Sequence, residues 1–302
     1  MEIQNYLPMA FRTQINGEML KDAEEIRLRV GQPLEILYAD EESRKFGRIS
    51  GEQIKEMLNY LCGYSVYAIE EELRQGYFTV EGGHRIGVSG RTSYQKKGRW
   101  NEMNPLSLVS GLNIRLAHEK KGCALQVIPY LYHNRSIYHT FLFAPPGVGK
   151  TTYLRDCIRC LSKGGEGKRG LKISVVDERS EIAACHRGIP QNDLGPRTDV
   201  LDNCPKEQGM RMLLRSMSPE VIAVDELGTP EDFAAVYDCA RCGISVLGTI
   251  HAGDKEEVIK RLSGNGLSQI LKECRLVGLK RLGDGKRKIM VYDGKGELLW
   301  EK

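Results

Sequence analysis

The chain of 302 residues lacks an apolar run long enough to cross a lipid bilayer. A membrane-spanning helix needs about 20 consecutive apolar residues, whereas the longest apolar runs here, such as residues 221–224, have the length of a strand. The first residues also lack the basic and then apolar pattern of a secretory signal. These absences predict a cytoplasmic protein that reaches a membrane only peripherally, through partners.

The chain also carries little net charge and few aromatic residues. Its formal net charge is +4, and aromatic residues make up 7%. A mildly basic, mixed charge permits contact with nucleic acid but does not argue for it. The Lys/Arg-rich stretches 164–172 and 280–288 contain none of the aromatic side chains on which bases stack. Nucleic acid is therefore not an expected partner.

Free thiols fit the sequence better than a disulfide framework, because the nine cysteines are odd in number and scattered. Two pairs have CxxC spacing, Cys157/Cys160 and Cys239/Cys242, and both lie in stretches with helical periodicity. A zinc site needs four ligands close together. Buried free thiols are the favoured interpretation, with metal binding as the alternative.

The hydrophobic pattern divides the chain into two expected domains, 1–134 and 135–302. The first has the mixed pattern of a small α+β domain, with strands expected at 25–30 and 113–117, a helix at 53–61 and two strands within 76–90. The second alternates strands and helices, as a parallel sheet with crossover helices does. Its expected strands are 138–143, 172–176, 221–224 and 244–250, its helices 151–161, 207–217 and 230–241, and its tail a hairpin at 288–300.

The residues between the strand 138–143 and the helix 151–161 match a phosphate-binding loop, except that alanine replaces the first glycine. Glycines in such a loop turn backbone N–H groups toward phosphate oxygens, and the helix dipole also favours negative charge there. We expect Lys150 to reach the β- and γ-phosphates and Thr151 to bind magnesium. The predicted nucleotide-binding residues are Ala144, Pro145, Pro146, Gly147, Val148, Gly149, Lys150, Thr151 and Thr152.

A phosphate-binding loop needs an acidic partner at a neighbouring strand end. Asp225 and Glu226 follow the apolar residues 221–224. We expect Asp225 to hold the metal shell with Thr151, and Glu226 to polarise the attacking water. The alternative is a helix cap with a neighbouring charge.

Two further strand ends carry candidate catalytic residues. The acidic stretch 177–181 follows one strand, and either Glu178 or Glu181 could lie near the γ-phosphate, with Glu181 preferred. His251 ends the strand 244–250 and is expected to sense the γ-phosphate. A solvated charge run and a surface histidine are the alternatives. The predicted catalytic set is Lys150, Glu181, Glu226 and His251, with Glu178 as the alternative to Glu181.

An arginine that neutralises charge in the transition state is expected but cannot be chosen from sequence alone. The candidates are Arg85, Arg91 and Arg115 in the first domain and Arg197, Arg211 and Arg215 in the second.

The order of these motifs resembles the secretion ATPases of type II and type IV systems. Residues 177–181 stand where that family has its aspartate box, and residues 249–251 where it has its histidine box. The chain departs from that family in having Asp225-Glu226 where Gly-Glu is usual. A closer resemblance, to the stage III AA family of sporulation proteins, covers nearly the whole chain and includes residues 81–87 (Glu-Gly-Gly-His-Arg-Ile-Gly).

These resemblances imply a P-loop NTPase of RecA-like fold, with a first domain like the amino-terminal domain of secretion ATPases. They imply an ATPase that uses ATP and Mg²⁺ and assembles as a homo-hexamer. They also imply a place in the mother cell, beside membrane proteins of the channel that joins it to the forespore. A nucleic-acid-stimulated ATPase is the main alternative, and a nucleotide-gated scaffold is the other. The carboxylates Asp225 and Glu226 argue against the scaffold.

Overall fold

A computed structural model describes residues 3–39, 42–63, 72–73, 76–97, 100–165, 167–283 and 286–302; for residues 92–107 it describes the backbone alone. The chain forms two compact units, Met1–His118 and Glu119–Lys302. The boundary lies earlier than the expected 134/135, because Ala124, Val127 and Leu131 are fully buried in the core of the second unit. Among the described residues, no helix is both long and apolar enough to cross a membrane.

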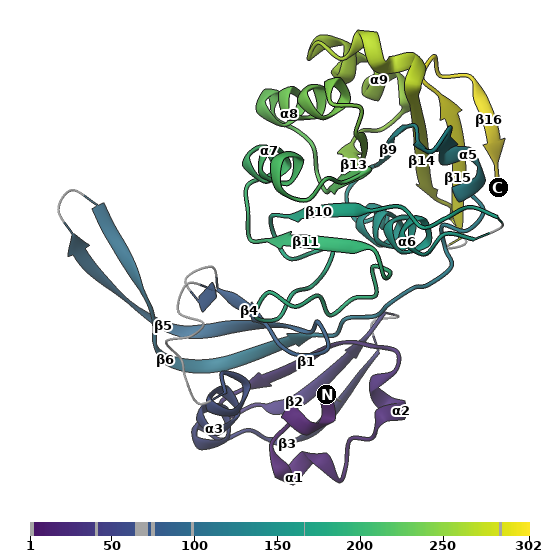
Figure 1. The fold of residues 1–302 in the computed structure, drawn as a ribbon. Coiled ribbons are helices and arrows are strands. Elements are labelled where there is room, and N and C mark those ends of the chain that lie inside the picture. The colour runs from purple at the N-terminus through teal and green to yellow at the C-terminus, as the bar shows by residue number, and fades with distance from the viewer. Residues whose placement is uncertain are drawn as a thin grey trace. The chain divides into compact units, whose positions relative to one another are not determined.

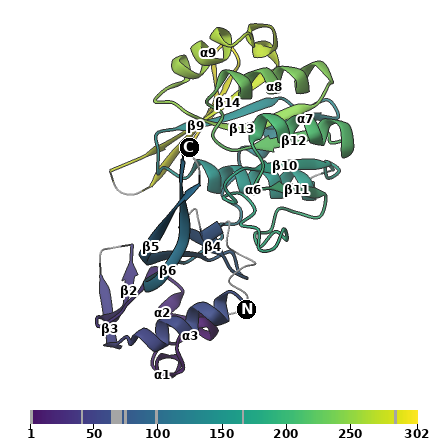
Figure 2. The same cartoon turned by 90° about the vertical axis from the view of Figure 1, so that its left-hand side faces the viewer.

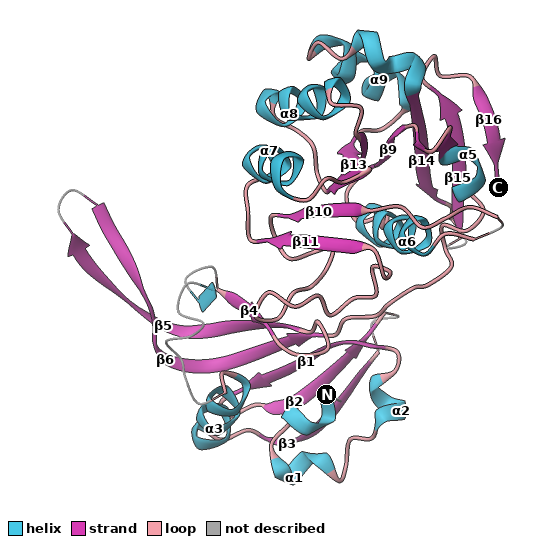
Figure 3. Ribbon diagram, viewed as in Figure 1, coloured by secondary structure: helices cyan, strands magenta, loops and turns pink. Residues whose placement is uncertain are grey.

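The first unit is an antiparallel sheet covered on one face by short helices (Figure 3). Its strands are ordered β3-β2-β1-β6-β5-β4. The strands are β1 (Ala23–Arg29), β2 (Pro33–Tyr38), β3 (Ser43–Arg48), β4 (Tyr77–Thr79), β5 (Arg85–Lys97) and β6 (Trp100–Arg115). The helices are η1 (Ile3–Tyr6), α1 (Met9–Arg12), α2 (Gly17–Leu20) and α3 (Gly51–Leu61). Strands β5 and β6 extend well past the other strands as a two-stranded ribbon (Figure 1).

Buried and exposed side chains alternate along strands such as β1, so only one face of this sheet packs against a hydrophobic core. Ile26 and Leu28 are buried, while Glu25, Arg27 and Arg29 of the same strand are partly or fully exposed. An antiparallel sheet can leave one face to solvent in this way. The strand predicted at 25–30 and the helix predicted at 53–61 are therefore confirmed, as β1 and α3.

The second unit is a largely parallel sheet of eight described strands, ordered β11-β10-β12-β13-β9-β14-β15-β16. They are β9 (His139–Ala144), β10 (Ile173–Asp177), β11 (Thr198–Asp202), β12 (Val221–Val224), β13 (Ser245–His251), β14 (Cys274–Arg281), β15 (Arg287–Asp293) and β16 (Leu298–Glu301). The helices are α5 (Ile128–Leu131), α6 (Lys150–Lys163), α7 (Lys206–Ser216), α8 (Pro230–Arg241), α9 (Lys255–Gly264) and η3 (Ser268–Glu273), and β7 (Tyr132–His133) pairs with β8 (Ser136–Ile137). The sequence did not predict β11, β14 or α9.

Strands β9, β10, β12 and β13 of this sheet are buried on both faces, which explains their apolar runs. Along β9, Leu142 and Ala144 join the core under α6, whereas Phe141 and Phe143 join the core under α7, α8 and α9. The helices accordingly lie on opposite faces (Figures 1 and 2). Parallel strands β10, β12, β13 and β9 end at one edge, and this edge holds every candidate residue of the nucleotide site.

Cys157 and Cys160 lie on α6, whereas Cys239 lies on α8 and Cys242 is the C-cap of α8, on the opposite face of the sheet. Cys157 is fully buried in the first of the two cores and Cys239 in the second; Cys160 is buried and Cys242 exposed. Burial raises the pKa of Cys239 to about 12, which keeps that thiol protonated. Cys157, Cys160 and Cys239 thus pack as the sequence favoured.

Candidate nucleotide site

The loop between β9 and α6 has the backbone that anion binding requires. Gly147 and Gly149 have φ of +76° and +104°, values that glycine adopts without steric cost. Gly149 is the N-cap of α6, and no side chain caps the helix there. The first N–H groups of α6 are thus left to a ligand, at the end where the helix dipole favours negative charge.

Lys150 is folded over this loop. Its side chain is buried, and its Nζ donates to the carbonyl oxygens of Ala144 at 3.0 Å and Pro145 at 3.2 Å. Nζ also lies 3.0 Å from Nδ1 of His251. Burial is the main cause that lowers the pKa of Lys150, while Asp225 and Glu226 oppose this effect. The ammonium group is therefore partly desolvated and next to the expected phosphate position.

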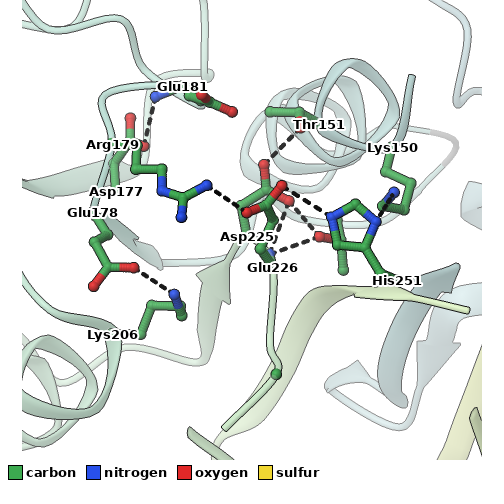
Figure 4. A network of polar contacts seen from close by, with 12 residues as sticks. Lys150, Thr151, Asp177, Glu178, Arg179, Glu181, Lys206, Asp225, Glu226 and His251 are labelled. Carbon is green, nitrogen blue, oxygen red and sulfur yellow. Dashed lines mark hydrogen bonds and ion pairs between the residues drawn. The ribbon is translucent and has the colours of Figure 1, made fainter. Parts of the chain in front are cut away.

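Asp225 is held by two hydroxyl groups. The Thr151 Oγ1 donates to Asp225 Oδ2 at 2.6 Å, and Thr249 Oγ1 donates to Asp225 Oδ1. Thr249 also accepts from the backbone N–H of Glu226 at 2.8 Å. A hydrogen bond thus joins Thr151, near the start of α6, to Asp225, the residue that follows β12 (Figure 4).

Glu226 lies between a histidine and an arginine. Its Oε1 is 3.0 Å from Nε2 of His251, and its Oε2 accepts from Arg179 Nη1 at 2.8 Å. The hydrogen bond with His251 is the largest influence that lowers the pKa of Glu226, so this carboxylate is ionised at neutral pH. Glu226 has φ of +54°, a left-handed conformation that is uncommon outside glycine.

His251 joins the loop lysine to the acidic strand end. Because an ammonium group only donates, Nδ1 of His251 must accept from Lys150, which places the ring proton on Nε2 in the neutral imidazole. That N–H then donates to Glu226. The result is a continuous chain of hydrogen bonds from Lys150 to Glu226, drawn in Figure 4.

The acidic stretch after β10 divides into different roles. Asp177 is buried, and its two oxygens accept the backbone N–H groups of residues 181, 182 and 183 at 2.7–3.2 Å. Glu178 forms an ion pair with Lys206 of α7. Arg155 of α6 donates to the carbonyl oxygens of Glu181 at 2.8 Å and of Ile182 at 2.8 Å.

A narrow cleft brings these groups together, with Glu178, Glu181, Asp225 and Glu226 among its lining residues. The predicted site residues thus lie together at the carboxyl edge of the parallel strands. They are Lys150, Thr151, Glu178, Glu181, Asp225, Glu226 and His251. Three contributors were not predicted. Arg179 lies inside the acidic stretch, and Arg155 lies one turn after Thr151 on α6. Lys206 begins α7, and only its place after the acidic stretch hints at its pairing.

Among the candidate arginines of the second unit, the side chain of Arg211 has other partners. Arg211 donates to Asp238 at 3.1 Å and pairs with Glu207, so it fastens α7 to α8. Arg197 lies in the loop just before β11, as the sequence predicted, and its backbone N–H donates to Ser162. In the first unit, the guanidinium carbon of Arg85 lies 4.3 Å from the centre of the Tyr77 ring. These contacts do not select an arginine for the site.

Known relatives identify the family of this chain. The family described as sporulation stage III, protein AA matches residues 1–299. The chain belongs to this family. Stage III sporulation protein AA of Bacillus subtilis (strain 168) is 38% identical over 301 residues, which cover 99% of this chain and 96% of that protein.

Solved structures give the fold. The chain is similar to the pilus retraction motor PilT with bound ADP, with a TM-score of 0.64 and 18% identity over 97% of this chain and 83% of PilT. The ATPase DotB of Legionella pneumophila gives a TM-score of 0.59 and 18% identity over 94% of this chain and 80% of DotB. The likeness to these two solved structures confirms the predicted fold class, a P-loop core plus a smaller α+β domain.

Proposed function

We propose that this member of the family is a Mg²⁺-dependent ATPase. The observation that carries the proposal is the 2.6 Å hydrogen bond between Thr151 and Asp225, next to a loop lysine that is linked through His251 to Glu226. The resemblance of the fold to an ATPase and to a motor with bound ADP supports the same conclusion.

The residues present fit magnesium. Mg²⁺ prefers oxygen ligands, and nucleotide sites commonly bind it with one or two protein groups while phosphates and water complete the shell. Thr151 Oγ1 and Asp225 Oδ2 are such oxygens and already lie next to each other. When bound, the ion neutralises charge on the phosphates during transfer.

Residues 144–152 would bind the phosphates. Their N–H groups supply the anion site, and Lys150 exchanges the carbonyl oxygens of Ala144 and Pro145 for the β- and γ-phosphates. A phosphate offsets the desolvation that lowers the pKa of Lys150, because it brings negative charge to a partly buried ammonium group.

Glu226, with Glu181, would orient the attacking water. The water oxygen forms a bond to the γ-phosphorus, the bond from that phosphorus to the bridging oxygen breaks so that ADP leaves with the electron pair, and the proton of the water passes to the carboxylate of Glu181. The low pKa of Glu226 makes it an ionised acceptor but a weak base, which suits orientation of the water better than full proton removal. His251 contacts both Lys150 and Glu226, so loss of the γ-phosphate would change this chain of hydrogen bonds.

The motor and its place in the cell belong to the same proposal. We infer a cytoplasmic homo-hexamer in the mother cell that hydrolyses ATP to energise the channel between mother cell and forespore. It would meet the membrane peripherally, through membrane proteins of the channel complex. The family and the likeness to a retraction motor support this inference. Arg85 and Arg115, which are register partners across β5 and β6, stay candidates for the arginine that stabilises the transition state, as does Arg91.

The test is the Lys150→Ala variant, assayed for release of phosphate from ATP in the presence of Mg²⁺. We expect turnover to fall by about 10²-fold or more, because the variant loses a positioned charge at the transferring phosphate. Lys163→Ala removes an exposed lysine from the other end of the same helix and should leave turnover unchanged. Wild-type turnover by a folded Lys150→Ala variant would overturn the site assignment.

A further inference from the structure

Arg287 contacts the phosphate-binding loop from a distant part of the chain. It is the first residue of β15, and its Nε donates to the carbonyl oxygen of Val148 at 3.0 Å. A β-carbon on Gly149 would lie only 3.1 Å from Arg287 Nη2. The guanidinium group therefore packs directly against the peptide that joins Val148 to Gly149.

The sheet topology explains how β15 reaches this loop. Strand β14 runs parallel to β9, so both end at the edge where the loop begins. Strand β15 returns antiparallel from that same edge, and Arg287 pairs with Arg281, the last residue of β14. Every antiparallel neighbour of β14 must start at this edge, which places Arg287 beside the loop.

The contact fixes the direction of one N–H group. A trans peptide is planar, and its C=O and N–H point in opposite directions. The described residues contain no cis peptide. Because Arg287 holds the Val148 carbonyl, the Gly149 N–H points away from Arg287. Phosphate-binding loops need successive N–H groups directed at the anion.

Glycine makes this peptide easy to turn. Gly149 has φ of +104°, in the region that side-chain-bearing residues rarely adopt. With the peptide reversed, the Val148 carbonyl would point to the side where its N–H now points, and a carbonyl oxygen repels phosphate. An external donor on the carbonyl is the physical means of disfavouring that reversed state.

We propose that Arg287 is a positioning residue that holds the Val148–Gly149 peptide in the orientation that binds phosphate. The inference rests on the proposed nucleotide site and adds a residue to its support. Arg287 is exposed, so water competes for the same carbonyl and the effect is moderate.

The binding test compares MgADP affinity by titration calorimetry in wild type, Arg287→Ala, Arg287→Lys and Arg281→Ala. We expect the dissociation constant of Arg287→Ala to rise about tenfold, as for loss of one charge-assisted hydrogen bond, with the unfolding temperature of the nucleotide-free protein unchanged. Arg287→Lys keeps a donor and should recover most of the affinity. Arg281→Ala removes an exposed neighbouring charge and should bind as wild type does.

The orientation itself has a spectroscopic readout. The sequence contains three Val–Gly peptides, at residues 30–31, 148–149 and 277–278, so protein labelled with ¹³C-carbonyl valine and ¹⁵N-glycine gives three amide signals. The signal that disappears in Val148→Ala belongs to Gly149. We expect Arg287→Ala, but not Arg281→Ala, to shift or broaden it in the free protein.

The outcomes separate the two proposals. If wild type does not bind MgADP, both the nucleotide site and the role of Arg287 are overturned. If wild type binds and Arg287→Ala binds equally well, or if Arg281→Ala weakens binding to the same extent, the positioning role alone is wrong. An unchanged Gly149 signal in Arg287→Ala contradicts it too.

Discussion

The aspartates at the ends of β10 and β12 occupy equivalent places, yet the fold surrounds them differently. Val176 and Val224 are register partners in parallel strands, so Asp177 and Asp225 follow side by side. The oxygens of Asp177 accept three backbone N–H groups from its own loop.

Asp225 instead meets two hydroxyl groups, from Thr151 on α6 and Thr249 on β13. A carboxylate already saturated by backbone N–H groups holds a loop in shape and has little capacity left for a metal. A carboxylate that faces hydroxyl groups can exchange them for a cation and water. The neighbouring elements, more than the acidic residue itself, determine which role a strand-end aspartate takes.

Asp225→Asn is the variant for which we expect the largest effect, and it tests whether Asp225 is a metal ligand. We expect Mg²⁺-dependent ATP hydrolysis to fall by about 10²- to 10³-fold, because the variant loses a negatively charged metal ligand. Binding of ADP in the presence of a chelator should change little, since the loop 144–152 binds the phosphates directly. An assay of phosphate release measures the loss of hydrolysis, and ADP titration with and without Mg²⁺ measures the binding. Equal loss of ADP binding with and without Mg²⁺ would show that Asp225 shapes the loop and is not a metal ligand.

The matching change at Asp177 should affect stability more than chemistry. Asparagine has one acceptor oxygen, so Asp177→Asn leaves buried N–H groups of residues 181–183 without a partner. We expect the free energy of unfolding at pH 7 to fall by about 1–3 kcal/mol, measured by urea denaturation. Asp199→Asn, an exposed aspartate on the neighbouring strand β11, is the control and should change it by less than about 0.5 kcal/mol.

The pH dependence of this loss has a definite sign. Burial is the largest influence that raises the pKa of Asp177, to about 6, above the value of about 3.9 in an unfolded chain. The folded state therefore binds the proton more tightly, and the resulting stability is present below about pH 4 and lost as the pH rises through about 6. Asp177→Asn should thus be more destabilising at pH 4 than at pH 7. A constant difference across this range would contradict the raised pKa.

Much of the site could be predicted because its residues follow strands directly. Lys150, Thr151, Asp225 and His251 each belong to a short motif at a strand end, and parallel strands bring such ends to one edge. The same periodicity predicted β9, β10, β12 and β13 of the parallel sheet, although not β11, and the helices α6, α7 and α8. It did not predict β14, although that strand lies beside β9.

The supporting contacts could not be predicted, because they join elements that are distant in sequence. Arg155 donates to the loop after β10, 26 and 27 positions further along the chain. Arg287 lies 139 positions from the carbonyl that it contacts. Arginines on helix surfaces and at strand ends are common, so nothing in their local sequence distinguishes Arg155 and Arg287 from solvated charges. The domain boundary was placed too late for a similar reason, since α5 packs under α6 only in the folded chain.

The smallest expected effect concerns the acidic stretch after β10, where the sequence left Glu178 and Glu181 as alternatives for the residue near the γ-phosphate. Glu178 is paired with Lys206, whereas the backbone of Glu181 is held from both sides, by Asp177 and by Arg155. A group that orients water must itself be fixed in place. We therefore expect Glu181→Gln to lower kcat by about tenfold or more, toward the range of general base catalysis. Glu178→Gln should stay within about twofold, because the Glu178 carboxylate is already paired with Lys206 and a partly exposed ion pair contributes little. Steady-state kinetics on both variants, with unfolding temperatures as the control for folding, decide between them. The opposite ranking would assign the role to Glu178 and make its pair with Lys206 a part of the site.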